Sequence, residues 1–187
     1  MESSALLSAL AAGIWLLLPA GAANMAPVLA ARAFPSWDLP VDFGWSPGGK
    51  RLFGAHKTWR GMAAGVIAGG LVFVLQQHVA DLSPAIQGLL ADLDHGRLPL
   101  LFGAWLGLGA LVGDLVKSFA KRRLGIAPGR SWFPFDQLDW LFGALAFASP
   151  FLRLSGGLMA AVLLLGLVLH LAIHALGRAM GLNRSWI

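Results

Sequence analysis

Long apolar runs separated by short polar segments dominate this chain of 187 residues. Five of the runs approach the length of about 20 residues that a helix needs to cross a bilayer. They cover roughly 4–31, 59–79, 98–119, 138–154 and 156–178. Pro19 and Pro27 interrupt the first run, which predicts a kink or a break there. The pattern predicts an all-α integral membrane protein, a bundle of about five transmembrane helices forming one domain over residues 1–187.

The composition agrees with a multi-pass protein of the cell membrane. Charged residues make up only 12% of the chain, whereas a soluble domain carries about 25%. There is no cysteine, which excludes disulfides, thiolate nucleophiles and cysteine metal sites. The formal net charge is +5, and in a membrane protein such a charge favours anionic headgroups or nucleotides over nucleic acid as partners.

The positions of lysine and arginine predict the orientation. Of the 14 basic residues, Arg97 and Arg153 alone lie on one side of the predicted bundle. Because basic residues concentrate in cytoplasmic loops, the N-terminus is expected outside and the C-terminus in the cytoplasm. The first run lacks the positively charged start of a signal peptide, so we interpret it as a retained helix.

Small residues recur at four-residue spacing along the second and third runs. This spacing lets helix backbones approach closely in lipid, so it predicts tight packing rather than chemistry. The glycines concerned are Gly61, Gly65 and Gly69, then Gly103 with Gly107 and Gly109 with Gly113.

The third run ends in a polar helical face. Asp114, Lys117, Ser118 and Lys121 follow the spacing i, i+3, i+4 and i+7, which places them on one side of a helix. A carboxylate inside an apolar run is costly and therefore a candidate for function. The alternative is a simple salt bridge from Asp114 to Lys117 or Lys121, with the lysine reaching toward the interface.

The fourth run begins with the segment FPFDQLDW. Asp136 and Asp139 are three residues apart, so both carboxylates share a helical face. Together with Asp114 they would supply the oxygen ligands that magnesium prefers, alongside phosphate oxygens of a substrate. The alternative is stabilisation of a helix N-terminus by capping and by the helix dipole.

The loop GGKRLFGAHKTWRG, residues 48–61, is rich in basic residues and glycine. It leads into the second helix, whose N-terminus can itself bind an anion. It lacks the glycine spacing of a Walker motif. Attraction of a basic loop to acidic lipids is the alternative. The residues predicted to bind phosphate here are Lys50, Arg51, Lys57, Thr58 and Arg60.

These motifs resemble the CDP-archaeol synthase family, membrane cytidylyltransferases of the wider CDP-diacylglycerol synthase group. The matching segments are LPAGAANMAPVL (18–29), PVDFG (40–44), GKRLFGAHKTWRG (49–61), GDLVKSFAKRRLG (113–125), PFDQLD (134–139) and GLNRSW (181–186). The resemblance implies a magnesium-dependent nucleotidyltransferase of phospholipid biosynthesis that converts CTP and a lipid phosphate to a CDP-lipid and pyrophosphate. For archaeal members the implied acceptor is 2,3-di-O-geranylgeranylglyceryl phosphate.

The resemblance also implies roles for individual residues. Asp114, Lys121, Asp136 and Asp139 are the expected catalytic residues, and the three aspartates are the expected magnesium ligands. The expected nucleotide- and phosphate-binding residues are Lys50, Arg51, Lys57, Thr58, Arg60, Lys117, Ser118, Arg122 and Arg123.

Other functions stay open on sequence alone. The same chemistry on phosphatidic acid would give CDP-diacylglycerol. The apolar helices do not distinguish the two acceptors, because a hydrophobic groove suits acyl and isoprenoid chains alike. A small anion transporter would also explain basic loops and an intramembrane carboxylate. However, transporters place polar groups near the bilayer midplane and often show internal repeats, whereas here the polar groups gather at one end. The sequence leaves a homodimer open.

Overall fold

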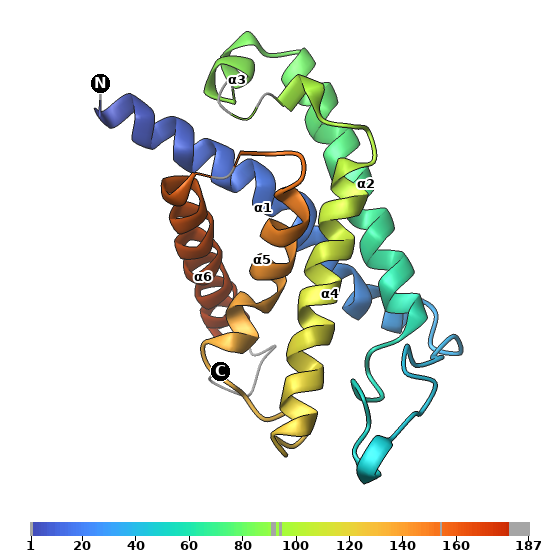
Figure 1. The fold of residues 1–187 in the computed structure, drawn as a ribbon. Helices are drawn as coiled ribbons and strands as arrows, with labels where there is room; N and C mark the ends of the chain where they lie inside the picture. The colour runs from blue at the N-terminus through green and yellow to red at the C-terminus, as the bar shows by residue number, and fades with distance from the viewer. Residues whose placement is uncertain (1, 91–92, 94, 154, 180–187) are drawn as a thin grey trace.

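The computed structural model describes residues 2–90, 93, 95–153 and 155–179, and side chains within 7–172 of these. The GLNRSW motif at 181–186 lies outside the described residues. Over the described ranges the chain is helical and forms no β-strand (Figure 1). The elements are α1 (Glu2–Ala33), η1 (Pro47–Gly49), α2 (Trp59–Asp81), α3 (Pro84–Leu89), η3 (His95–Arg97), α4 (Phe102–Arg123), α5 (Phe135–Ala148) and α6 (Gly156–Ala179).

The first helix, α1, is the element around which the bundle is arranged. It crosses the bundle diagonally and packs against α2, α4, α5 and α6 (Figure 1). It continues through Pro19 and Pro27, so the chain does not break at these prolines. Pro19 is fully buried against neighbouring helices, and neighbouring helices can accommodate a proline within a membrane helix.

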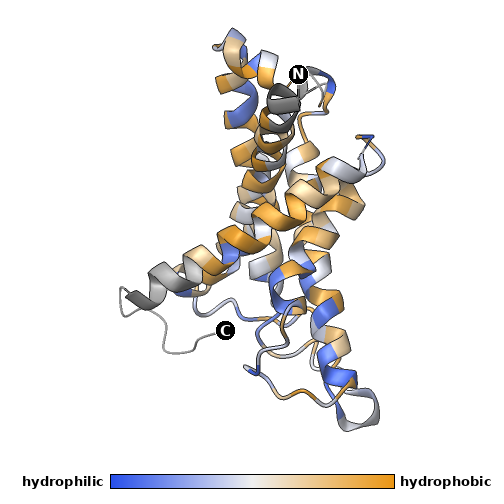
Figure 2. Ribbon diagram, turned by 90° about the vertical axis from the view of Figure 1, so that its left-hand side faces the viewer, coloured by the Kyte–Doolittle hydropathy of each residue, from blue (hydrophilic) through white to orange (hydrophobic). Residues whose placement is uncertain are grey.

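Within the described residues, three helices are long and apolar enough to cross a membrane: Leu7–Ala33, Trp59–Asp81 and Phe102–Arg123. The helix α5 has 14 residues, and the apolar part of α6 spans Gly156–Ala172. Hydrophobic residues follow the middle of the helices, while hydrophilic residues lie toward the two ends of the bundle, including the end that carries the α1–α2 loop (Figure 2). The all-helical fold is thus confirmed over the described residues. The number of helices that cross and their orientation stay predictions.

Two helices are displaced from their predicted positions. The third was expected at 98–119 and runs over Phe102–Arg123; the fourth was expected at 138–154 and runs over Phe135–Ala148. The hydropathy pattern predicts which residues lie in the hydrocarbon layer. The helix itself continues as long as its backbone hydrogen bonds do, so the two boundaries can differ. Lys121 and its basic neighbours therefore continue α4 beyond the apolar run. Asp114 consequently lies more than two turns before the end of α4.

The backbones of α4 and α5 touch through glycines. A Cβ atom on Gly113 would lie 2.1 Å from the carbonyl oxygen of Asp139, and one on Gly143 would lie 2.1 Å from that of Gly109. A Cβ on Gly69 would similarly meet the Gly103 carbonyl at 2.6 Å, between α2 and α4. The predicted close packing at small residues is confirmed. It brings the first turns of α5 directly against the polar face of α4.

Replacing Gly143 with alanine should therefore force α4 and α5 apart. Overpacking of this kind costs about 1–3 kcal/mol, so we expect a lower thermal unfolding midpoint in detergent. The matched control is Gly70→Ala, where the added Cβ would come no nearer than 3.4 Å to its neighbour Ala104. Equal midpoints for Gly143→Ala and Gly70→Ala would contradict the close contact of α4 and α5.

Candidate functional site

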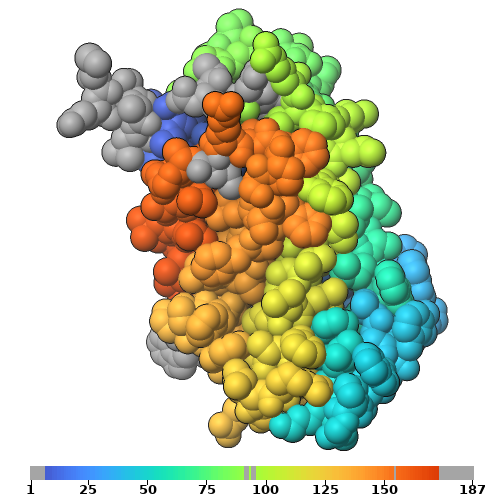
Figure 3. Space-filling model, in the orientation of Figure 1, coloured from blue at the N-terminus to red at the C-terminus, as the bar shows by residue number. Residues whose placement is uncertain are grey.

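The α1–α2 loop, residues 34–58, lies against the C-terminal half of α4. Figure 3 shows loop residues, in cyan, beside the end of α4, in yellow. The two ends of the loop pair with each other. The Val41 N–H donates to the Lys57 carbonyl at 2.8 Å, and the Trp59 N–H donates to the Leu39 carbonyl at 3.0 Å. This pairing fixes Lys57 at the start of α2.

Asp42 organises the interior of the loop. Its carboxylate accepts hydrogen bonds from the Arg51 guanidinium and from the backbone N–H groups of Gly44 (3.1 Å), Phe53 (3.1 Å) and Gly54 (3.2 Å). The side chain has no exposed surface. Burial opposes ionisation, but these donors outweigh it and lower the pKa of Asp42 to about 2. We call this arrangement the Asp42 clasp.

Arg123 attaches the loop to α4. Its guanidinium donates to the carbonyls of Pro47 (3.2 Å), Lys50 (2.7 Å) and Arg51 (2.9 Å). In return, the Lys50 ammonium donates to the Arg123 carbonyl at 3.2 Å. Arg123 was predicted to bind phosphate. Its described side-chain hydrogen bonds are made to the backbone of the loop instead.

Three carboxylates converge on one ammonium group. The Lys117 Nζ atom lies 3.1 Å from Asp114, 3.2 Å from Asp136 and 2.7 Å from Asp139. Lys57 pairs with Asp114 from the α1–α2 loop, and Lys121 pairs with Asp136 at 2.9 Å. We call this the ion cluster, and its charges balance: Asp114, Asp136 and Asp139 against Lys57, Lys117 and Lys121.

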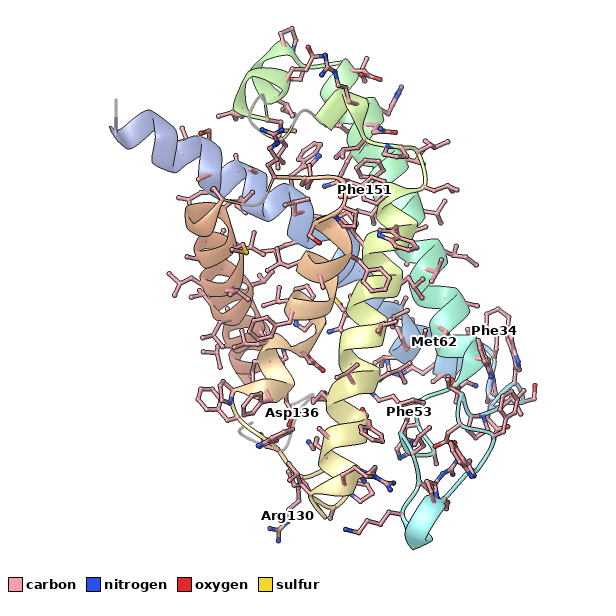
Figure 4. All side chains as sticks on the ribbon, viewed as in Figure 1. Phe34, Phe53, Met62, Arg130, Asp136 and Phe151 are labelled. Atoms are coloured by element: carbon pink, nitrogen blue, oxygen red, sulfur yellow. The ribbon has the colours of Figure 1, made fainter. Side chains whose placement is uncertain are left out.

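The start of α5 holds Asp136 toward α4. The carboxylate also accepts a hydrogen bond from the Trp132 backbone N–H, and Lys121 donates in addition to the Arg130 carbonyl. In Figure 4, Asp136 lies on one side of the lower part of α4 and Phe53 of the loop lies on the other. An acid at a helix N-terminus and a lysine in a last turn are both favoured by the helix dipoles. Capping alone, however, leaves the contacts to Lys117 unexplained.

The donors of the ion cluster suit a hard divalent cation. Carboxylate oxygens are the ligands that magnesium prefers, and three of them face one point. That point is taken by the Lys117 ammonium. As the described residues stand, no three acidic or histidine side chains are close enough to hold a metal ion directly. A cation at this position would therefore replace the Lys117 ammonium among the carboxylates.

A strongly basic cavity of about 580 Å³ lies between the α1–α2 loop, α4 and the turn that follows α4. Small-molecule sites generally have volumes of about 300–1,000 Å³. We call it the loop cavity. It is lined by Lys50, Arg51, Phe53, Gly54, Ala55, His56, Lys57, Lys117, Ser118, Lys121, Arg122 and residues 125–129.

A second cavity, of about 840 Å³, lies between α1, the start of α2 and α4. We call it the helix cavity, because helices form most of its wall. Its apolar side includes Val28, Leu111 and Leu115. Its polar lining residues are Asn24, Arg32, Asp38, His56, Lys57, Thr58, Arg60 and Asp114. The segment 55–57 lines both cavities, so it forms the partition between them.

The predicted site residues divide between these places. Lys50, Arg51, Lys57, Lys117, Ser118, Lys121 and Arg122 line the loop cavity; Lys57, Thr58, Arg60 and Asp114 line the helix cavity. Asp136 and Asp139 line neither, and stand behind Lys117 and Lys121.

Two residues of the predicted phosphate-binding loop have structural contacts as well. The Thr58 hydroxyl accepts from the Gly61 N–H at 3.2 Å and caps α2. The Arg60 guanidinium donates to the Phe34 carbonyl. Both side chains are largely buried, so they shape the wall of the helix cavity.

Sequence reasoning missed several residues that line or shape the cavities. Asp42 had a signal, since it is an acid just before a basic, glycine-rich loop. Arg32 ends α1, and Asn24 is a polar residue within an apolar helix, which is itself a functional signal. His56 and the turn 125–129 gave no signal that distinguishes them from ordinary loop residues.

These features define a class: a helical protein with helices of membrane-spanning length and with cavities rich in basic residues at one end of the bundle. Within this class, the chain belongs to the CDP-archaeol synthase family, because the family model described as CarS-like CDP-archaeol synthase matches residues 6–187. The resemblance seen in the sequence motifs is thereby confirmed.

Individual relatives agree with this membership. The chain is 39% identical to a CDP-archaeol synthase of Thermococcus gammatolerans over 94% of this chain and 95% of the relative. It is 36% identical to one of Pyrococcus furiosus, over 89% and 91%. A solved structure described as an intramembrane enzyme for archaeal membrane lipids biosynthesis aligns with a TM-score of 0.69 and 36% identity, over 87% of this chain and 92% of that one.

The Asp42 clasp leads to a prediction about pH. The folded-state pKa of Asp42 lies below its usual value of 3.8, so its stabilisation is present above about pH 4 and is lost as the pH falls toward 2. The fall from 3.8 to about 2 corresponds to roughly 60-fold in a local opening equilibrium, or about 2–3 kcal/mol. Asp42→Asn should therefore raise amide hydrogen exchange at Gly44, Phe53 and Gly54 by up to about 60-fold at pH 7.

The matched control is Asp38→Asn, an exposed aspartate of the same loop, which should leave this exchange unchanged. In wild-type protein, corrected for intrinsic exchange, this protection should fall only partly by pH 3, because the folded-state pKa of about 2 keeps most of the carboxylate ionised there. Unchanged protection in Asp42→Asn at pH 7 would show that the carboxylate does not hold the loop.

Proposed function

We propose that this protein transfers the cytidylyl group of CTP to a membrane lipid phosphate, giving a CDP-lipid and pyrophosphate with magnesium as cofactor. The observation that carries the proposal is the position of Lys57, which lines both cavities and pairs with Asp114 of the ion cluster. Two anionic substrates, one in each cavity, would both contact the Lys57 ammonium. The protein acts as a single-domain, multi-pass enzyme of the cell membrane.

The loop cavity suits the triphosphate donor. Its wall carries Lys50 and Arg122, which can neutralise phosphate charge directly, and Lys117 and Lys121, which can do so as they leave the carboxylates of the ion cluster. Arginine binds phosphate oxygens through two parallel hydrogen bonds, and lysine acts as a point charge. The loop carrying Lys50 and Arg51 is prearranged by the Asp42 clasp, which reduces the cost of ordering it on binding.

The helix cavity suits the lipid phosphate acceptor. Arg32 and Arg60 offer cationic groups, while Val28, Leu111 and Leu115 offer apolar walls from the membrane helices. This combination matches a molecule with an anionic head and hydrocarbon chains. The names of the family relatives support an archaeol-type acceptor, such as 2,3-di-O-geranylgeranylglyceryl phosphate.

The reaction joins the acceptor to the α-phosphorus of CTP. An oxygen of the lipid phosphate forms a bond to this phosphorus, the bond to the β-phosphate oxygen breaks, and its electron pair leaves with pyrophosphate. The attacking oxygen is already anionic near neutral pH, so alignment and charge neutralisation matter more than a strong base. Lys57 would align the two phosphates, and Lys117 and Lys121 would stabilise the leaving group.

Asp114, Asp136 and Asp139 would hold magnesium once the Lys117 ammonium moves toward the triphosphate. When bound, the cation supplies charge neutralisation at the phosphate oxygens. Lys117 is suited to this movement, because its ammonium stands between the carboxylates while its side chain lines the loop cavity.

The direct test is an assay with purified protein, magnesium, CTP labelled at the α-phosphate, and each candidate lipid phosphate. We expect label in the lipid phase, stoichiometric release of pyrophosphate, and preference for the isoprenoid ether acceptor over phosphatidic acid in competition. Folded protein that binds CTP yet labels neither lipid would refute these acceptors. Anion flux in proteoliposomes without CTP binding or covalent product would replace the proposal with transport.

Asp136→Asn and Asp139→Asn should each abolish most turnover, because both remove a ligand charge without changing side-chain shape. We expect kcat to fall by roughly 100-fold or more, equivalent to about 3 kcal/mol, in protein that stays folded but has a lower thermal unfolding midpoint, because Lys117 loses a paired charge. The control is Asp81→Asn at the far end of α2. Turnover retained in both variants would remove these residues from the metal site.

A further inference from the structure

The α1–α2 loop and the first residue of α2 present an apolar outer face built largely from aromatic side chains. Phe43 is 69% exposed and Trp45 is 64% exposed, and Phe34, Trp37 and Trp59 are exposed as well. In Figure 4, Phe34 lies on the side of the loop away from α4, whereas Phe53 lies toward α4. We call Phe34, Trp37, Phe43, Trp45 and Trp59 the aromatic face.

Charge is distributed unevenly between the two sides of this loop. Between the end of α1 and Gly49 the only charged residues are Asp38 and Asp42, and the side chain of Asp42 is fully buried. The basic residues Lys50, Arg51 and Lys57 line the loop cavity on the inner side. The outer surface over residues 34–45 is therefore apolar and nearly uncharged.

The aromatic face is held in place by the fold of the loop. Phe43 has a φ of 47°, an unfavourable conformation for a bulky side chain. It persists between Asp42, which the clasp fixes, and Gly44, whose N–H bonds to Asp42. The Trp45 N–H donates to the Asp42 carbonyl at 2.7 Å, and the rings of Phe43 and Trp59 lie 6.2 Å apart. The surrounding loop therefore keeps Phe43 in a strained backbone conformation in which its ring points outward.

The ends of the loop place this face at a membrane surface. The loop joins α1 to α2, and both helices are long and apolar enough to span. Tryptophan and other aromatic rings prefer the layer between hydrocarbon and headgroups. In water a contiguous exposed apolar surface is a liability and marks a contact site.

We propose that residues 34–45 lie in the interfacial layer of the bilayer that α1 and α2 cross, with the aromatic face as their lipid-binding surface. This part of the α1–α2 loop is then in contact with lipid, whereas Lys50, Arg51 and Lys57 line the loop cavity on the inner side. This placement sets Lys50, Arg51 and Lys57 at headgroup height. It also puts Asp38 and Pro40, which line the helix cavity, beside the lipid.

Spin labelling tests this placement, because the chain contains no cysteine and single cysteines can be introduced without removing others. Nitroxides at Phe43→Cys and Trp45→Cys would be measured in lipid nanodiscs holding one chain each, made from phosphatidylcholine and phosphatidylglycerol. We expect collisions with oxygen to exceed collisions with a water-soluble nickel chelate several-fold at both positions. Ser131→Cys, an exposed position in the α4–α5 loop, should show the reverse.

Water-like accessibility at positions 43 and 45 would overturn the proposal. So would dipolar broadening between labels in liposomes that disappears on dilution with unlabelled chain, because a second copy would then cover the face. If the cysteine variants fail to fold, quenching of native tryptophan fluorescence by brominated lipids gives an independent answer. Trp37→Phe with Trp45→Phe should remove part of the quenched fluorescence, and an unchanged quenched fraction would equally overturn the proposal.

Discussion

The convergence of Asp114, Asp136 and Asp139 on the Lys117 ammonium is the interaction on which the site depends. Removing one partner from such a cluster would leave an uncompensated, largely buried charge, which is strongly destabilising. The cluster also requires α4 and α5 to touch, which Gly113 and Gly143 allow. The ion pairs of the site therefore depend on the packing of the bundle. Lys57, which pairs with Asp114, connects the cluster to the α1–α2 loop.

This arrangement suggests how a small membrane protein brings a polar and an apolar substrate together. The segment 55–57 separates a basic cavity at the loop from a larger cavity walled by membrane helices. The Asp42 carboxylate binds the N–H of Gly54, directly before this segment, and Arg123 attaches the adjoining loop to α4. The same clasp fixes the aromatic face outward. Attachment to lipid and alignment of the two phosphates would therefore depend on one short loop.

Sequence alone predicted the parts of the site that local spacing determines. The helical face of Asp114, Lys117, Ser118 and Lys121, and the pairing of Asp136 with Asp139, follow from helix periodicity. It also anticipated the grouping of the three aspartates and, as an alternative, the salt bridge from Asp114 to Lys117. It did not predict that Lys117 reaches Asp139, because this contact requires the close approach of two helices. It also missed the Asp42 clasp, whose donors other than the Gly44 N–H lie nine to twelve residues away in an irregular loop. The spans were displaced where basic residues prolonged α4 beyond its apolar run.

The central claim is that the two substrates occupy separate cavities on either side of Lys57. Steady-state kinetics of Lys50→Ala and Arg32→Ala test it most directly, since both are exposed cations and each lines one cavity only. We predict that Lys50→Ala raises the KM for CTP with little change for the lipid phosphate, and that Arg32→Ala does the opposite. An equal rise of both KM values in either variant would contradict the two-cavity account.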